Sequence, residues 1–100
     1  PLALVVHAGI RPGVDLQAQA EHDLVWIRKP FLESHADFGA LVVHGHTALD
    51  RPVLYRNRLN LDSGAAYGRS LSAVVIEPGA VHLLTASGRR PLQVEALPCA

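Results

Sequence analysis

Apolar runs of strand length alternate with turn-forming residues in the first half of the chain. Residues 2–6 and 41–44 are short apolar runs, each with a pair of β-branched valines, typical of buried strands, and each leads into or ends at a histidine. Between them we expect helical structure over residues 15–34, because apolar side chains recur there close to the helical period. Those side chains are Leu16, Leu24, Ile27 and Phe31. Pro30 is expected to divide this stretch into two short helices.

The second half of the chain is rich in predicted strands. Residues 52–55 and 58–62 have the pattern of short strands, and residues 70–77 alternate weakly before a Pro-Gly turn and a hairpin partner over 81–85. The pattern predicts an α/β fold that becomes β-rich toward the carboxyl end. We expect the domain to cover residues 1–87, with residues 88–100 as a tail that frays at its Gly-Arg-Arg-Pro start.

Composition narrows the class of protein without identifying a function. The 100 residues are 49% hydrophobic and carry nine Lys+Arg against nine Asp+Glu, so charge indicates neither a nucleic-acid nor a membrane partner. No apolar run approaches the ~18 residues of a membrane span. The single cysteine, Cys99, excludes an internal disulfide and fits a reducing compartment, so we predict a cytoplasmic protein.

Candidate chemistry concentrates where the two apolar runs end. The first reads Val-Val-His-Ala-Gly with the histidine at His7, and the second reads Val-Val-His-Gly-His-Thr with histidines at His44 and His46. Neutral imidazole is the commonest protein ligand for a transition metal, and a side chain at the end of a buried strand is held rigidly at the rim of a sheet. Histidines on adjacent strand ends would be able to share one ion.

These two segments, with Leu-Val-Trp-Ile-Arg at residues 24–28 and the run over residues 57–65, resemble the calcineurin-like metallophosphoesterases of the serine/threonine phosphoprotein phosphatase family. The bacterial and phage branch, which includes diadenosine tetraphosphate hydrolases, is the most similar. The resemblance implies that His7 and His46 bind one metal of a two-metal centre and that Arg28 binds the substrate phosphate. It favours manganese, with iron or zinc as alternatives.

The family's upstream sequence elements are absent from this chain. It contains no D-x-H, G-D-x-x-D-R-G or G-N-H-[DE] element, which in the family supply the other metal ligands and the general acid. We therefore expect the second half of a metallophosphoesterase α/β sandwich, with mixed sheets flanked by helices. We also expect it to pair with the N-terminal half of the same domain and to be inactive alone.

Further residues are expected to have supporting roles or to lie outside the site. His44 is expected to orient a ligand or bridge a phosphate-bound water, and Asp62 to support His46. Arg11 follows His7 closely enough to reach the same site. Trp26 is expected to anchor its helix in the core. His22, His35 and His82 match no motif and are expected on the surface.

The predicted rim of the site bears on the choice of substrate. The predicted rim over residues 10–22 lacks the basic cluster that a long polyphosphate would favour, so a serine/threonine phosphoprotein is preferred over diadenosine tetraphosphate. An alternative of another class is a non-catalytic module whose histidines bind a structural metal, or an interaction module. Structural zinc sites normally use four protein ligands, often including cysteine.

Overall fold

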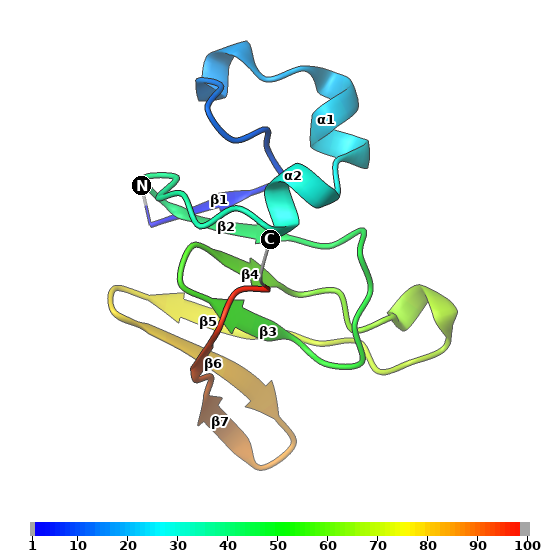
Figure 1. The fold of residues 1–100 in the computed structure, drawn as a ribbon. Helices are drawn as coiled ribbons and strands as arrows, with labels where there is room; N and C mark the ends of the chain where they lie inside the picture. Colours follow the sequence, from blue (N-terminus) through cyan, green and yellow to red (C-terminus); the bar gives the residue numbers. More distant parts are fainter. Residues whose placement is uncertain (1, 99–100) are drawn as a thin grey trace.

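Two β-sheets and a helical layer stack on one another in the computed structural model, which describes residues 2–98 (Figure 1). The five-stranded sheet consists of β1 (Ala3–Val5), β2 (Leu41–His44), β3 (Val53–Tyr55), β4 (Arg58–Asn60) and β8 (Val94–Glu95). The three-stranded sheet consists of β5 (Val74–Glu77), β6 (Ala80–Thr85) and β7 (Gly88–Pro91). The helices are α1 (Glu21–Trp26), α2 (Lys29–Leu32) and two 3-10 turns, Leu16–Ala18 and Ala65–Tyr67. The predicted α/β class with mixed sheets is confirmed.

Parallel pairing of β1, β2 and β4 brings their carboxyl ends to one edge of the larger sheet. The strand order is β1-β2-β4-β3-β8, with β3 antiparallel to β4 and parallel to β8. In register, Val5 lies beside Val43, and His44 lies beside Asn60. Since β1 and β2 end side by side, the segments that follow them start from neighbouring positions.

The central strands are buried on both faces, which explains their continuous apolar sequence. Val42 packs toward the helical layer in a cluster with the fully buried Phe31. Val43, one residue later, packs with Leu59 and Val81 between the two sheets. Successive strand residues point to opposite faces, so Val42 packs in the core under the helices and Val43 in the core between the two sheets. Figure 1 shows α1 and α2 on one side of the larger sheet and β5–β7 on the other.

The helical segment is divided at a different place from the one expected at Pro30. That proline lies in the first turn of α2, where its missing N–H leaves no bond unmade. The break falls at Ile27, whose backbone is extended (φ −59°, ψ 144°), and at Arg28, whose backbone is neither helical nor extended (φ −131°, ψ −94°). Arg28 therefore lies in the bend between α1 and α2.

Strands continue beyond the predicted end of the domain. Residues 88–91 form β7 and pair with β6, and β8 pairs with β3, so the fraying expected after Ser87 is wrong over this stretch. A paired edge strand satisfies the backbone groups that a frayed tail would leave to water. Cys99 lies outside the described residues. Within residues 2–98, every helix is too short or too polar to span a lipid bilayer.

Candidate functional site

The two segments that follow β1 and β2 bring His7 and His46 together. Nε2 of His7 lies 3.2 Å from Nδ1 of His46, and the ring centroids are 5.0 Å apart. The backbones are joined as well, because the Gly45 N–H donates to the His7 carbonyl at 2.8 Å. The parallel pairing thus produces the juxtaposition that the strand-end histidines predict.

The separation of the two ring nitrogens fits a shared metal ion. Two nitrogens each ~2.0–2.1 Å from a tetrahedral ion lie about 3.3 Å apart, close to the 3.2 Å between His7 and His46. The facing atoms, Nε2 of His7 and Nδ1 of His46, would be the donors. Among residues 2–98, no group of three or more His, Cys, Asp or Glu side chains is arranged to hold an ion. The described chain therefore offers two donors to such an ion.

Arg28 and Trp26 border the histidine pair from the helical side. Nε of Arg28 donates to Nε2 of His46 at 3.4 Å, and the Trp26 ring meets the His46 ring edge-on at 5.6 Å. Trp26 is 61% exposed, so the expectation that it anchors its helix in the core is wrong. It is the last residue of a six-residue helix, and the core contacts here come instead from Leu24 in the helix and from Ile27 just after it.

The surroundings of His46 favour its neutral form. Burial is the largest cause of its lowered pKa, and the charges of Arg28 and His7 act in the same direction. A neutral imidazole is the form that binds metals. Since Nε2 accepts a hydrogen bond from the Arg28 N–H, the ring proton of neutral His46 lies on Nδ1 and is donated to His7.

His44 is engaged within the protein through both ring nitrogens. It is 3% exposed, Nε2 lies 3.0 Å from Nη1 of Arg58, and Nδ1 lies 3.2 Å from the Gly45 carbonyl oxygen. Burial lowers its pKa to about 4, and the charge of Arg58 adds to this shift. The ring packs edge-on against Phe31 at 4.9 Å. With both nitrogens occupied, His44 has no free ring nitrogen for a phosphate-bound water, and it connects to the His46 turn through the Gly45 carbonyl.

Asp62 lies beneath the turn that carries His46. Its Oδ1 accepts the Gly64 N–H at 3.0 Å, and its own N–H donates to the Asn60 side chain at 3.0 Å. A side chain placed on Gly45 would come within 3.3 Å of its Cβ. Asp62 thus shapes the loop after β4 and packs against the turn, and its negative charge slightly opposes the lowering of the His46 pKa.

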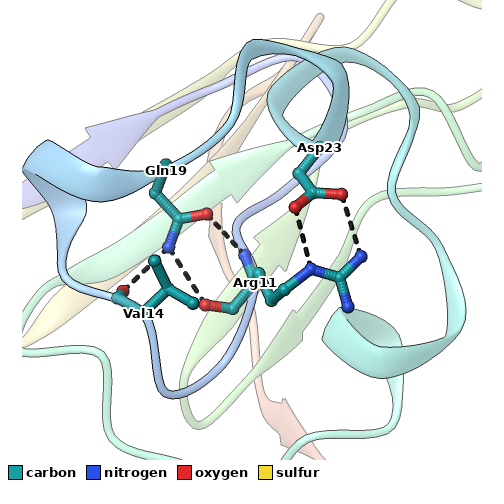
Figure 2. Close-up of polar contacts among 4 residues, drawn as sticks. All are labelled: Arg11, Val14, Gln19 and Asp23. Atoms are coloured by element: carbon teal, nitrogen blue, oxygen red, sulfur yellow. Dashed lines mark hydrogen bonds and ion pairs between the residues drawn. The ribbon is translucent and has the colours of Figure 1, made fainter.

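Arg11 forms its hydrogen bonds with Asp23 and Gln19 and not with the histidine pair. Its guanidinium forms a bidentate ion pair with Asp23, with distances of 2.8 and 2.9 Å (Figure 2). This pair raises the pKa of Arg11 and lowers that of Asp23. Gln19 bonds the N–H and the carbonyl of Arg11 and the carbonyl of Val14, which closes the loop before α1 (Figure 2). Arg11 therefore braces this loop.

A shallow pocket of about 360 Å³ opens beside the histidine pair. Its lining combines polar and apolar side chains, namely Val5, Val6, His7, Val43, His44, Gly45, His46, Leu61, Asp62, Leu71 and Ser72. Val5 is 78% exposed and Leu71 is 88% exposed. A larger cavity, of about 470 Å³, lies between residues 10–16 and 36–40 and contains no histidine.

Arg58 and Asn60 are buried residues of β4 that sequence reasoning missed. Arg58 is 2% exposed and contacts His44, while Asn60 is 2% exposed and donates to the Thr47 carbonyl at 2.8 Å. The available signal was the Arg-Leu-Asn-Leu pattern, in which polar residues alternate with leucines in a strand that has both faces covered. His22 and His35 are exposed as expected, whereas His82 is half-buried with an unpartnered Nδ1.

Comparison of the chain with protein families, curated proteins and solved structures gives no match. The resemblance to metallophosphoesterases therefore depends on the motifs and on the geometry described above.

Proposed function

We propose that this chain is part of a metal-dependent phosphoester hydrolase of the phosphoprotein phosphatase type, with a serine/threonine phosphoprotein as substrate. The observation that carries the proposal is the convergence of His7, His46 and Arg28. They come from three separate motifs, yet Arg28 lies 3.4 Å from His46, and His46 lies 3.2 Å from His7. Two metal donors and one guanidinium at the end of a parallel sheet suit phosphate chemistry.

Each of the three residues has a defined task in this proposal. His7 and His46 hold a divalent ion, Mn²⁺ by preference, through the two nitrogens that face each other. A pair of such ions would supply a water of lowered pKa and neutralise charge on the phosphoryl group. Arg28 is exposed at the bend between α1 and α2, where its planar guanidinium is able to fork two phosphate oxygens.

The remaining ligands would come from the N-terminal half of the same domain, docked at the β1 edge. Among residues 2–98, β1 pairs only with β2 in the five-stranded sheet, so these residues leave its other edge open beside His7. Val5 and Leu71 leave apolar surface exposed around the histidine pocket. An unpaired edge and an apolar surface are features that a further element of a fold covers.

The charges near the site favour a phosphoprotein over a dinucleoside polyphosphate. Arg11 is neutralised by Asp23, so it adds no free positive charge to the rim. A chain of four phosphates would be bound better by several unpaired cations. The compartment we propose is the cytoplasm, in keeping with the single cysteine of the sequence.

Manganese binding by the chain is the direct test. We expect Mn²⁺ titrated into the protein and followed by electron paramagnetic resonance to bind, and His7→Ala and His46→Ala each to abolish that binding. His22→Ala is the matched control, because His22 is exposed and outside the site. Equal binding by the wild type and His46→Ala would overturn the metal site.

Hydrolysis assays separate the proposed function from its alternatives. We expect this chain alone to show no Mn²⁺-dependent hydrolysis of an aryl phosphate. Turnover that His46→Ala removes would mean that the centre assembles without an upstream half. When the chain is joined to a domain half carrying the absent elements, preference for diadenosine tetraphosphate over a phosphopeptide would overturn the substrate assignment. Metal binding without turnover there would indicate a structural metal module.

A further inference from the structure

We propose that Arg58 is a positioning residue for His46, acting through the His44 ring and the Gly45 carbonyl; this inference builds on the proposed role of His46 as a metal ligand. Arg58 lies on β4 and is 2% exposed, so it does not reach the site itself. Its influence passes along hydrogen bonds, each of which the structure records.

The first step selects the tautomer of His44. Nη1 of Arg58 lies 3.0 Å from Nε2 of His44 in a buried contact. A guanidinium has only N–H donors, so Nε2 must accept and the ring proton of His44 must lie on Nδ1. Arg58 thus makes Nδ1 of His44 a hydrogen-bond donor.

The second step holds the turn that carries His46. Nδ1 of His44 donates to the Gly45 carbonyl oxygen at 3.2 Å, and the same oxygen accepts the Thr47 N–H at 2.7 Å. The bond from Thr47 to Gly45 closes a three-residue turn around His46, whose φ is +69°. Among the described residues, His46 alone has a positive φ without being glycine. Such turns are rare and strained, so a second donor on the carbonyl stabilises an unfavourable conformation.

The third step ties the turn to the other metal donor. The Gly45 N–H donates to the His7 carbonyl at 2.8 Å, and the His44 carbonyl accepts the Leu61 N–H at 2.9 Å. The peptide that joins Gly45 to His46 is thus oriented by the His44 ring. The preceding peptide, which joins His44 to Gly45, is fixed to the segment of His7. Rotation of the Gly45 carbonyl would swing the His46 ring away from His7.

The surroundings of Arg58 favour a positioning role over a purely stabilising one. None of the ion pairs recorded among residues 2–98 involves Arg58, and its Nε is buried without a partner. It stacks on the Tyr55 ring at 4.1 Å and donates to the Leu32 carbonyl at 3.2 Å. A buried cation is costly compared with an apolar residue of similar volume, so its presence is better explained by the tautomer it selects.

The test follows the metal-free protein by NMR and Zn²⁺ binding by calorimetry. In Arg58→Met we expect long-range ¹H–¹⁵N spectra to show His44 losing its single Nδ1–H tautomer, and contacts between the His7 and His46 rings to weaken. Zn²⁺ affinity should fall about 10- to 100-fold, the usual effect of losing an orienting partner. Arg58→Lys retains a donor and should recover part of that loss. Arg56→Met, an exposed neighbour on the same hairpin, is the matched control.

Replacements of His44 test the second step without removing Arg58. His44→Asn can present an N–H to the Gly45 carbonyl and should keep the ring contacts of His7 and His46, whereas His44→Leu should lose them. If Arg58→Met does not fold, this pair decides the proposal. Unchanged ring contacts and Zn²⁺ affinity in His44→Leu would overturn it. Failure of the wild type to bind either Mn²⁺ or Zn²⁺ would overturn the proposed function, while the ring contacts would still report on positioning.

Discussion

Nε2 of His7 lies 3.2 Å from Nδ1 of His46, although 39 residues separate them in the sequence. The two rings belong to segments that follow adjacent parallel strands and are joined by a backbone hydrogen bond from Gly45 to His7. Arg28 approaches the far side of the His46 ring. The His46 ring therefore contacts His7 through one nitrogen and Arg28 through the other.

Metal binding should release Arg28. In the metal-free arrangement Nε2 of His46 accepts from Arg28, but an ion on Nδ1 would leave the ring proton on Nε2, where it repels another donor. We expect Zn²⁺ to shift the Arg28 Nε–H resonance in ¹H–¹⁵N spectra toward that of a solvated arginine. The resonance of the Arg11 Nε–H, which is hydrogen-bonded to Asp23, should not shift. If the Zn²⁺-induced shift of the Arg28 Nε–H resonance persisted in His46→Ala, metal binding would not be linked to Arg28 through the His46 ring.

Phosphate binding should distinguish Arg28 from Arg11. With Mn²⁺ present, Arg28→Ala should weaken inorganic phosphate binding about 10-fold or more, because a charge-assisted hydrogen bond contributes ~1.5–3 kcal/mol. Arg11→Ala should leave phosphate affinity unchanged, since its guanidinium is bound to Asp23. Isothermal titration calorimetry measures both. Equal losses in the two variants would mean that the loop before α1 reaches the phosphate.

Stability should fall in mild acid because of His44. Its pKa is about 4 in the folded protein and about 6.5 when exposed, so the unfolded state binds the proton first as pH falls. The stability due to neutral His44 is therefore fully present above pH 6.5 and is lost progressively down to pH 4. The full loss is about 3 kcal/mol from 1.36 kcal/mol per pKa unit.

Urea denaturation of the metal-free protein between pH 4 and 7 checks this prediction. His44→Asn, which has no titrating ring, should show a distinctly smaller change in the free energy of unfolding over that range. Parallel pH profiles for wild type and variant would show that other groups cause the acid sensitivity.

Gly9 should be intolerant of a side chain. Its φ is +155°, and an added Cβ would clash with Cδ2 of the fully buried Phe31 and lie 2.7 Å from its Cε2 and Cγ. We expect Gly9→Ala to destabilise the fold by about 3 kcal/mol, from overpacking together with backbone strain. Gly13→Ala is the control, because Gly13 also has a positive φ but an added Cβ meets nothing within 4 Å. It should lose only about 1 kcal/mol from strain.

The denaturant midpoints of Gly9→Ala and Gly13→Ala measure this difference in stability. Because Gly9 follows His7 closely, Gly9→Ala should also weaken metal binding, whereas Gly13→Ala should not. Similar stabilities for the two variants would show that Phe31 repacks at little cost.

Local pattern was sufficient to predict β1 to β6 and the helical segment, but not all of their ends and not β7 or β8. The apolar runs before His7 and His44 form β1 and β2 because both faces of these strands are covered. The helix break was wrongly predicted at Pro30 because a proline is also acceptable in the first turn of a helix. Residues 88–91 were expected to fray because β6, which satisfies their backbone, is recognisable only as a partner in three dimensions.

The candidate site divides in the same way. His7 and His46 were proposed from histidines at strand ends beside glycines, and Arg28 from the Trp-x-Arg element of the resemblance, all of which are local features. The pairing of Arg11 with Asp23, the exposure of Trp26 and the burial of Arg58 against His44 depend on contacts between distant segments. The sequence by itself determined where the strands before His7 and His44 end and which side chains stand at those ends, because hydrophobic period and turn chemistry act over a few residues. Only tertiary structure decided which ring nitrogen faces which partner, because that depends on strand register and on which groups are removed from water.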